Sequence, residues 1–125
     1  MLNNIIILSV GAAFGASLRW LFGLWFAHSP LWLSAGTLAA NWTGAYLIGL
    51  LAELFAAFPS FSPHWKLLLI TGFLGSLTTL SGLSLEIVGQ LQQHRLAAAF
   101  STAALHLAGS LLLTYSGILT VQALR

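Results

Sequence analysis

Four long apolar stretches limit the possible folds of this chain more than any other feature of its sequence. They lie near residues 4–27, 34–57, 66–91 and 96–121, separated by short polar or proline-containing breaks. A helix needs about 20 mostly apolar residues to cross the roughly 30 Å hydrocarbon core of a bilayer, so each stretch is long enough to span it once. The expected fold is therefore all-α, a single transmembrane domain of residues 1–125 with four helices in a lipid bilayer.

The composition excludes several classes of protein. Hydrophobic residues make up 58% of the chain and charged residues only 5%, whereas soluble domains contain about 25% charged residues. The few basic residues are scattered, which argues against a nucleic-acid partner. There is no cysteine for a disulfide or a thiolate metal site. No nucleophile occurs with a base and an orienting residue, so we do not expect an enzyme.

Positive charge is divided evenly between the two expected sides of the membrane. Because the breaks are short, sequential helices should be antiparallel neighbours, and both termini should lie on one side. Lys66 and Arg125 belong to that side, while Arg95 and Arg19 belong to or lie near the other. Such a tie gives no strong orientation under the positive-inside rule. We therefore expect chains in both orientations and an antiparallel, dual-topology homodimer, with an ion pathway between or alongside its subunits.

The middle of the third stretch should not form a regular helix. Residues 71–84 contain three glycines and six serine or threonine residues. This predicts a helix that is broken in mid-span, which at membrane depth is tolerated only where the backbone is buried in protein or lines a cavity. Freed carbonyls there can hold a cation, and hydroxyls and amides can hold an anion. The alternative is a kink healed by hydroxyls that bond back to the preceding turn.

Other polar side chains within the stretches each need a partner or a function, because burying them in a bilayer is costly. Arg19 is either an interfacial anchor or a functional cation. Asn41 either joins two helices or offers its amide hydrogens to an anion. Glu86 is either a vestibule residue or a protonated acid. A stripe of polar residues in the last stretch should face a hydrated path or a partner helix; its members are Thr102, His106, Ser110 and Thr114.

These motifs together resemble the small bacterial fluoride channels of the Fluc or CrcB family over nearly the whole chain. The matching pieces are residues 11–19, 36–41 and 72–79, followed by Glu86. The resemblance implies a multi-pass protein of the bacterial inner membrane that exports fluoride and so lowers its cytoplasmic concentration. It also implies an inverted homodimer with two pores and a structural sodium ion at its centre, bound by the backbone carbonyls of Gly75 and Thr78.

The resemblance assigns pathway and sodium residues to the last three stretches, and we assign Arg19 and Glu86 to the vestibule of the pathway. The family usually has two phenylalanines where this chain has Leu80 and Leu83, and a small hydroxyl where it has His106. Leucine has no aromatic quadrupole to offer an anion, so donors must come from elsewhere. The implied fluoride pathway comprises Asn41, Thr79, Leu80, Ser81, Leu83, Ser84, Thr102, His106, Ser110 and Thr114.

Two other functions remain open at this stage. One is a small dual-topology, proton-coupled exporter of organic cations, which would need an acidic residue deep in the first helix. This chain has Arg19 there instead. The other is a non-conducting accessory membrane subunit, which the two leucines make more credible.

Overall fold

Four helical spans make up the whole chain. The computed structural model describes residues 1–125. The first, second and last spans are continuous helices: α1 (Leu2–Trp25), α2 (Ala35–Ala57) and α6 (Leu96–Leu124). All four spans are long and apolar enough to cross a membrane. The all-α, four-helix transmembrane fold expected from the sequence is thereby confirmed, and the helix ends differ from the expected ones by at most three residues.

The third span is a composite of four segments. It begins with α3 (Pro63–Lys66), continues as the π-helical segment η1 (Leu67–Leu74) and ends its first half with α4 (Gly75–Leu77). After two residues with extended backbone, its second half follows as α5 (Leu80–Gln92). The predicted break is confirmed, whereas the π-helical turn was not predicted. Because π-helical turns hold more residues than α-helical ones, η1 changes which side chains face its neighbours.

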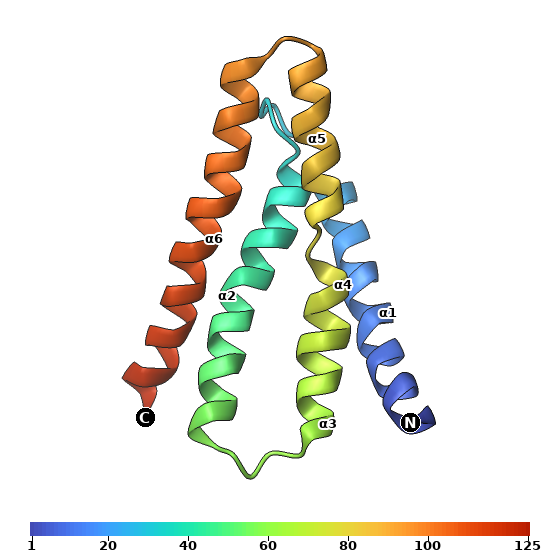
Figure 1. Ribbon diagram of the computed structural model, residues 1–125, viewed down its shortest axis with the longest axis vertical. Coiled ribbons are helices and arrows are strands. Elements are labelled where there is room, and N and C mark those ends of the chain that lie inside the picture. The colour runs from blue at the N-terminus through green and yellow to red at the C-terminus, as the bar shows by residue number, and fades with distance from the viewer.

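The spans form a tapered bundle. Both termini and the α2–α3 connection lie at its splayed end, whereas the α5–α6 turn lies at its narrow end (Figure 1). Helix α2 packs along α6, and α1 packs along η1 and α4. Helix α5 leaves the line of α4 and packs against α6. The two halves of the third span therefore belong to different parts of the bundle.

Glycines allow the helices to approach closely at two crossings. A Cβ added to Gly72 would lie 2.5 Å from the carbonyl oxygen of Leu8 in α1. A Cβ added to Gly49 or Gly117 would overlap backbone atoms of the facing helix at the α2–α6 crossing. Small residues are the usual means by which membrane helices pack, since lipid offers no hydrophobic drive for association. Only glycine fits at these points.

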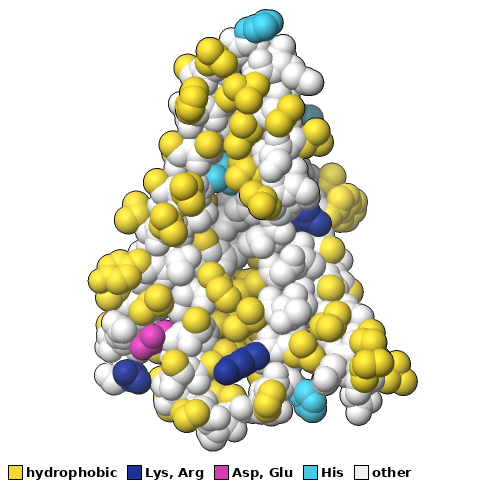
Figure 2. Space-filling view, viewed as in Figure 1, with side chains coloured by type: hydrophobic (Ala, Val, Ile, Leu, Met, Phe, Trp, Pro, Cys, Tyr) yellow, Lys and Arg dark blue, Asp and Glu magenta, His cyan; other side chains and the backbone are white.

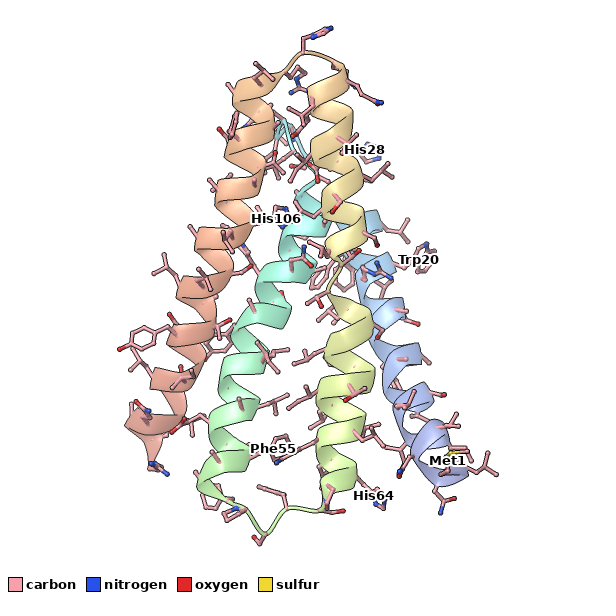
Figure 3. All side chains as sticks on the ribbon, in the orientation of Figure 1. Met1, Trp20, His28, Phe55, His64 and His106 are labelled. Carbon is pink, nitrogen blue, oxygen red and sulfur yellow. The ribbon has the colours of Figure 1, made fainter.

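The exterior is apolar, as expected for a chain surrounded by lipid. Hydrophobic side chains are spread over the whole face shown in Figure 2, and charged side chains are few there. Phe14, Phe100 and Leu112 are all more than two-thirds exposed. Trp20 points away from the bundle (Figure 3). Few side chains are buried, and several of those are polar.

Candidate functional site

Asn41 bridges the break in the third span. Its Oδ1 accepts the backbone N–H of Thr79 at 2.7 Å, and its Nδ2 donates to the backbone carbonyl of Thr79 at 3.1 Å. Backbone groups freed by a broken helix must find partners in a bilayer, where water is absent. One amide side chain from α2 here replaces two helical hydrogen bonds. Asn41 thus joins two helices, which is one of the two roles that the sequence left open for it.

The break frees two carbonyls in particular. In a continuous helix the N–H groups of residues 79 and 82 would donate to the carbonyls of Gly75 and Thr78. Here the N–H of Thr79 donates to Asn41, and the N–H of Gly82 donates to Oγ1 of Thr79 at 2.9 Å. The latter bond is the N-cap of α5. Both carbonyls therefore lose their usual donors, and both residues line the same groove.

His106 lies next to this bridge, in the polar stripe of α6. Its Nδ1 is 3.1 Å from Nδ2 of Asn41, and its side chain extends toward α2 (Figure 3). The side chain is 3% exposed, and its Nε2 has no hydrogen-bond partner. Thr102, one turn earlier, is fully buried and its hydroxyl also lacks a partner. Farther along, the hydroxyl of Thr114 donates to the carbonyl of Ala45 at 2.8 Å.

An open groove of about 700 Å³ runs between the α2–α6 pair and the third span. Its lining is mainly apolar, with polar groups at the break and along α6. Figure 2 shows the hollow in the middle of this face. Leu80 lines it and is 76% exposed. The predicted site residues that line the groove are Asn41, Gly75, Thr78, Thr79, Leu80, Leu83, His106, Ser110 and Thr114.

Five predicted site residues lie outside the groove lining. Ser81 and Ser84 are exposed on α5, and the hydroxyl of Ser81 is 3.2 Å from that of Thr79. Thr102 is buried behind the groove, and Arg19 is half-buried on α1. Glu86 contacts the start of α2, where its Oε1 accepts the backbone N–H of Ser34 at 2.7 Å. Its Oε2 has no partner.

One buried polar residue and two polar contacts were missed by the sequence analysis. Gln90 is buried and its Oε1 has no partner. In the sequence, the feature that points to it is its position four residues after Glu86, on the same face of the helix. Trp42 Nε1 donates to the carbonyl of Leu105 at 3.1 Å. The hydroxyls of Tyr46 and Thr120 are 2.9 Å apart. The last two contacts tie α2 to α6 across many intervening residues, and no local pattern reveals them.

Fold and site together define a small, multi-pass membrane protein with a polar-lined groove at a break in its third span. A sequence profile of the family described as "CrcB-like protein, Camphor Resistance (CrcB)" matches residues 6–118. The chain belongs to this family.

Curated relatives match almost end to end. A protein of Neisseria meningitidis serogroup C (strain 053442) is 59% identical over 120 residues, which cover 94% of each chain. One from Chromohalobacter salexigens is 50% identical over 98% of this chain and 92% of its own. One from Chromobacterium violaceum is 49% identical over 100% of this chain and 99% of its own. Each of these three relatives is named fluoride-specific ion channel FluC.

Proposed function

We propose that this protein is a fluoride-selective ion channel, not an enzyme, that exports fluoride across the bacterial inner membrane. The observation that carries the proposal is the near-complete match, at 49–59% identity, to proteins named for that function. The groove supports it, because polar groups occur at a helix break and along one stripe of α6 in an otherwise apolar molecule.

The groove further supports an inverted homodimer. The backbone is extended at Thr78 and Thr79, and next to it Gly75 and the side chain of Leu80 are exposed on an open face at membrane depth. Irregular backbone there is stable only when protein or a cavity covers it. A second copy supplies such a cover, and the balanced positive charge allows that copy to insert upside down. Two copies also give two equivalent grooves.

Fluoride would move along polar groups of α2, the break and α6. A selective path must replace the waters of a small, strongly hydrated anion with hydrogen-bond donors, and it needs several weak sites in series so that the ion can leave. The hydroxyls and the imidazole of the α6 stripe recur at each helical turn and so give several sites in series, although the hydroxyl of Thr114 donates to the carbonyl of Ala45 in the single chain. Leu80 and Leu83 shape the bore and exclude water. Arg19 and Glu86 are assigned to the vestibule, outside the groove lining.

A structural sodium ion would be held by the carbonyls of Gly75 and Thr78. The donor set fits, because hard monovalent cations bind oxygen ligands and both carbonyls have lost their helical donors at the break. Two carbonyls from each subunit of a two-fold dimer would surround one ion. The ion would fix the two breaks relative to each other and take no part in conduction.

Purified protein in liposomes tests the proposal directly. Fluoride efflux should be fast, chloride efflux should be slow, and a quaternary ammonium cation should not be transported with or without a proton gradient. Cation transport driven by protons would instead identify an exporter, and no flux of any kind from a folded dimer would identify an accessory subunit. Either result would overturn the proposed function.

A further inference from the structure

The orientation of the Asn41 amide is fixed by the backbone of Thr79. Amide oxygen and nitrogen are often hard to distinguish, and the hydrogen-bond network normally decides between them. Here Thr79 offers both a donor and an acceptor, 2.7 Å and 3.1 Å from the two ends of the amide. A flipped amide would set N–H against N–H and C=O against C=O. Nδ2 of Asn41 must therefore face away from the N–H of Thr79.

This orientation determines the tautomer of His106. The second hydrogen on Nδ2 of Asn41 points to Nδ1 of His106, 3.1 Å away. That ring nitrogen must then accept, and a neutral imidazole that accepts at Nδ1 carries its hydrogen at Nε2. The backbone of the break thus determines, through one amide, which nitrogen of a histidine on α6 is a donor.

The resulting Nε2–H group is a buried donor without an acceptor. His106 is 97% buried, and no group of the chain accepts from Nε2. Buried polar groups are nearly always paired, so an unpaired one needs an explanation. The hydroxyl of Thr102, one turn away on the same stripe, is also buried and unpaired. His106 lines the groove whereas Thr102 does not, so the Nε2–H group is the donor that the groove offers to a small acceptor from outside the chain.

We propose that Asn41 is a positioning residue that holds His106 as its Nε2–H tautomer, and that this N–H binds a small anion in the groove. The identity of the anion as fluoride rests on the proposed function. Asn41 itself has no free donor, since both hydrogens of Nδ2 are engaged. Its effect on the ion acts through His106. Unlike a hydroxyl, which rotates to suit its partner, the ring holds its donor in one direction.

Nuclear magnetic resonance of protein labelled with ¹⁵N-histidine tests the tautomer without any flux measurement. The other three histidines, His28, His64 and His94, are exposed. The set of imidazole signals that is lost in the His106→Gln variant identifies the signals of the His106 ring. At neutral pH the couplings should show a hydrogen on Nε2, and added fluoride should shift the Nε2 signal more than added chloride does. A hydrogen on Nδ1, or no response to fluoride, overturns the proposal.

Variants test the link between the two residues. Asn41→Asp keeps the size of the side chain but offers only acceptors, so the hydrogen of His106 should move to Nδ1 and the fluoride response should disappear. An unchanged tautomer in a folded Asn41→Asp dimer overturns the positioning role. If that variant does not fold, the tautomer of His106 in the parent protein still tests the proposal.

Flux through the same liposomes separates this inference from the proposed function. His106→Gln keeps an N–H near Nε2 and should conduct within a few-fold of the parent. His106→Leu should conduct roughly ten- to a hundredfold less, the usual effect of losing one donor to an anion. His94→Gln is the control. Equal flux in the glutamine and leucine variants overturns the donor role of His106. If the parent does not conduct but its His106 carries the hydrogen on Nε2, only the proposed channel function is refuted.

Discussion

Glu86 of α5 accepts the backbone N–H of Ser34, the N-cap residue of α2, at 2.7 Å, and this hydrogen bond links the two helices. A carboxylate at a helix N-terminus is stabilising because the helix dipole is positive there. Glu86→Gln keeps an acceptor and should lower the thermal midpoint only slightly. Glu86→Leu should destabilise the protein by about 1 kcal/mol, the typical value of one hydrogen bond. Thermal unfolding in detergent measures the stability of both variants. Equal thermal midpoints for the two variants would contradict the stabilising role of this hydrogen bond.

The α2–α6 crossing should not tolerate a side chain. Gly49→Ala places a methyl group against the backbone of Thr114 and should separate the two helices. We expect a loss of about 1–3 kcal/mol, as for other overpacked sites. Gly89→Ala is the matched control, because nothing lies within 4 Å of its added Cβ. It should be neutral or stabilise α5 by about 0.5–1 kcal/mol. A Gly49→Ala protein as stable as the parent or more so would contradict the close approach of α2 and α6 at this crossing.

Orientation in the membrane should respond to added charge. Lysines appended after Arg125 should favour one orientation, and Gln92→Lys with Gln93→Lys should favour the other. A cysteine added at the C-terminus reports orientation, since the chain contains no other cysteine. The parent should be labelled from both sides of intact cells. Each biased variant should be labelled from one side and conduct poorly, and co-expression of the two should restore flux.

Aromatic rings at the two leucine positions should be accepted. Leu80 and Leu83 both line the groove, and Leu80 is exposed in the single chain. Leu80→Phe with Leu83→Phe adds ring edges that attract an anion, so fluoride efflux should stay equal or rise. The control is Leu80→Met with Leu83→Met, which preserves volume without a ring. A loss of flux in the phenylalanine variant alone would mean that this bore is too narrow for rings.

Sodium should stabilise the dimer through backbone atoms only. Replacing sodium with a large organic cation should lower the thermal midpoint of the parent dimer. Thr78→Ser should retain the full sodium effect, because it keeps the carbonyl and also the hydroxyl that donates to Leu74. A midpoint that does not depend on sodium would rule out the site.

The sequence predicts the four spans because their apolar length alone requires a bilayer. It also predicts the break, since the glycine and hydroxyl residues around Thr78 weaken the helix locally. It does not predict η1, because no local pattern in the apolar run Leu67–Leu74 distinguishes a π-helical from an α-helical turn. Nor does it predict that Asn41 binds the backbone of Thr79, because the partners are 38 residues apart. The type of each polar residue was visible in the sequence, but its partner was not.

Asn41 and Ser34 are spaced seven residues apart on α2, as Thr79 and Glu86 are in the third span, and the two pairs are bonded in antiparallel register. The second half of the third span is therefore fastened to α2 at two points, while the first half packs against α1. The first half also meets α2, because Ala40 packs against Leu74 and Leu77 in the buried core. Helix α2 is thus bonded to one side of the break and packed against the other, so the backbone can stay irregular there without loosening the helices that flank it.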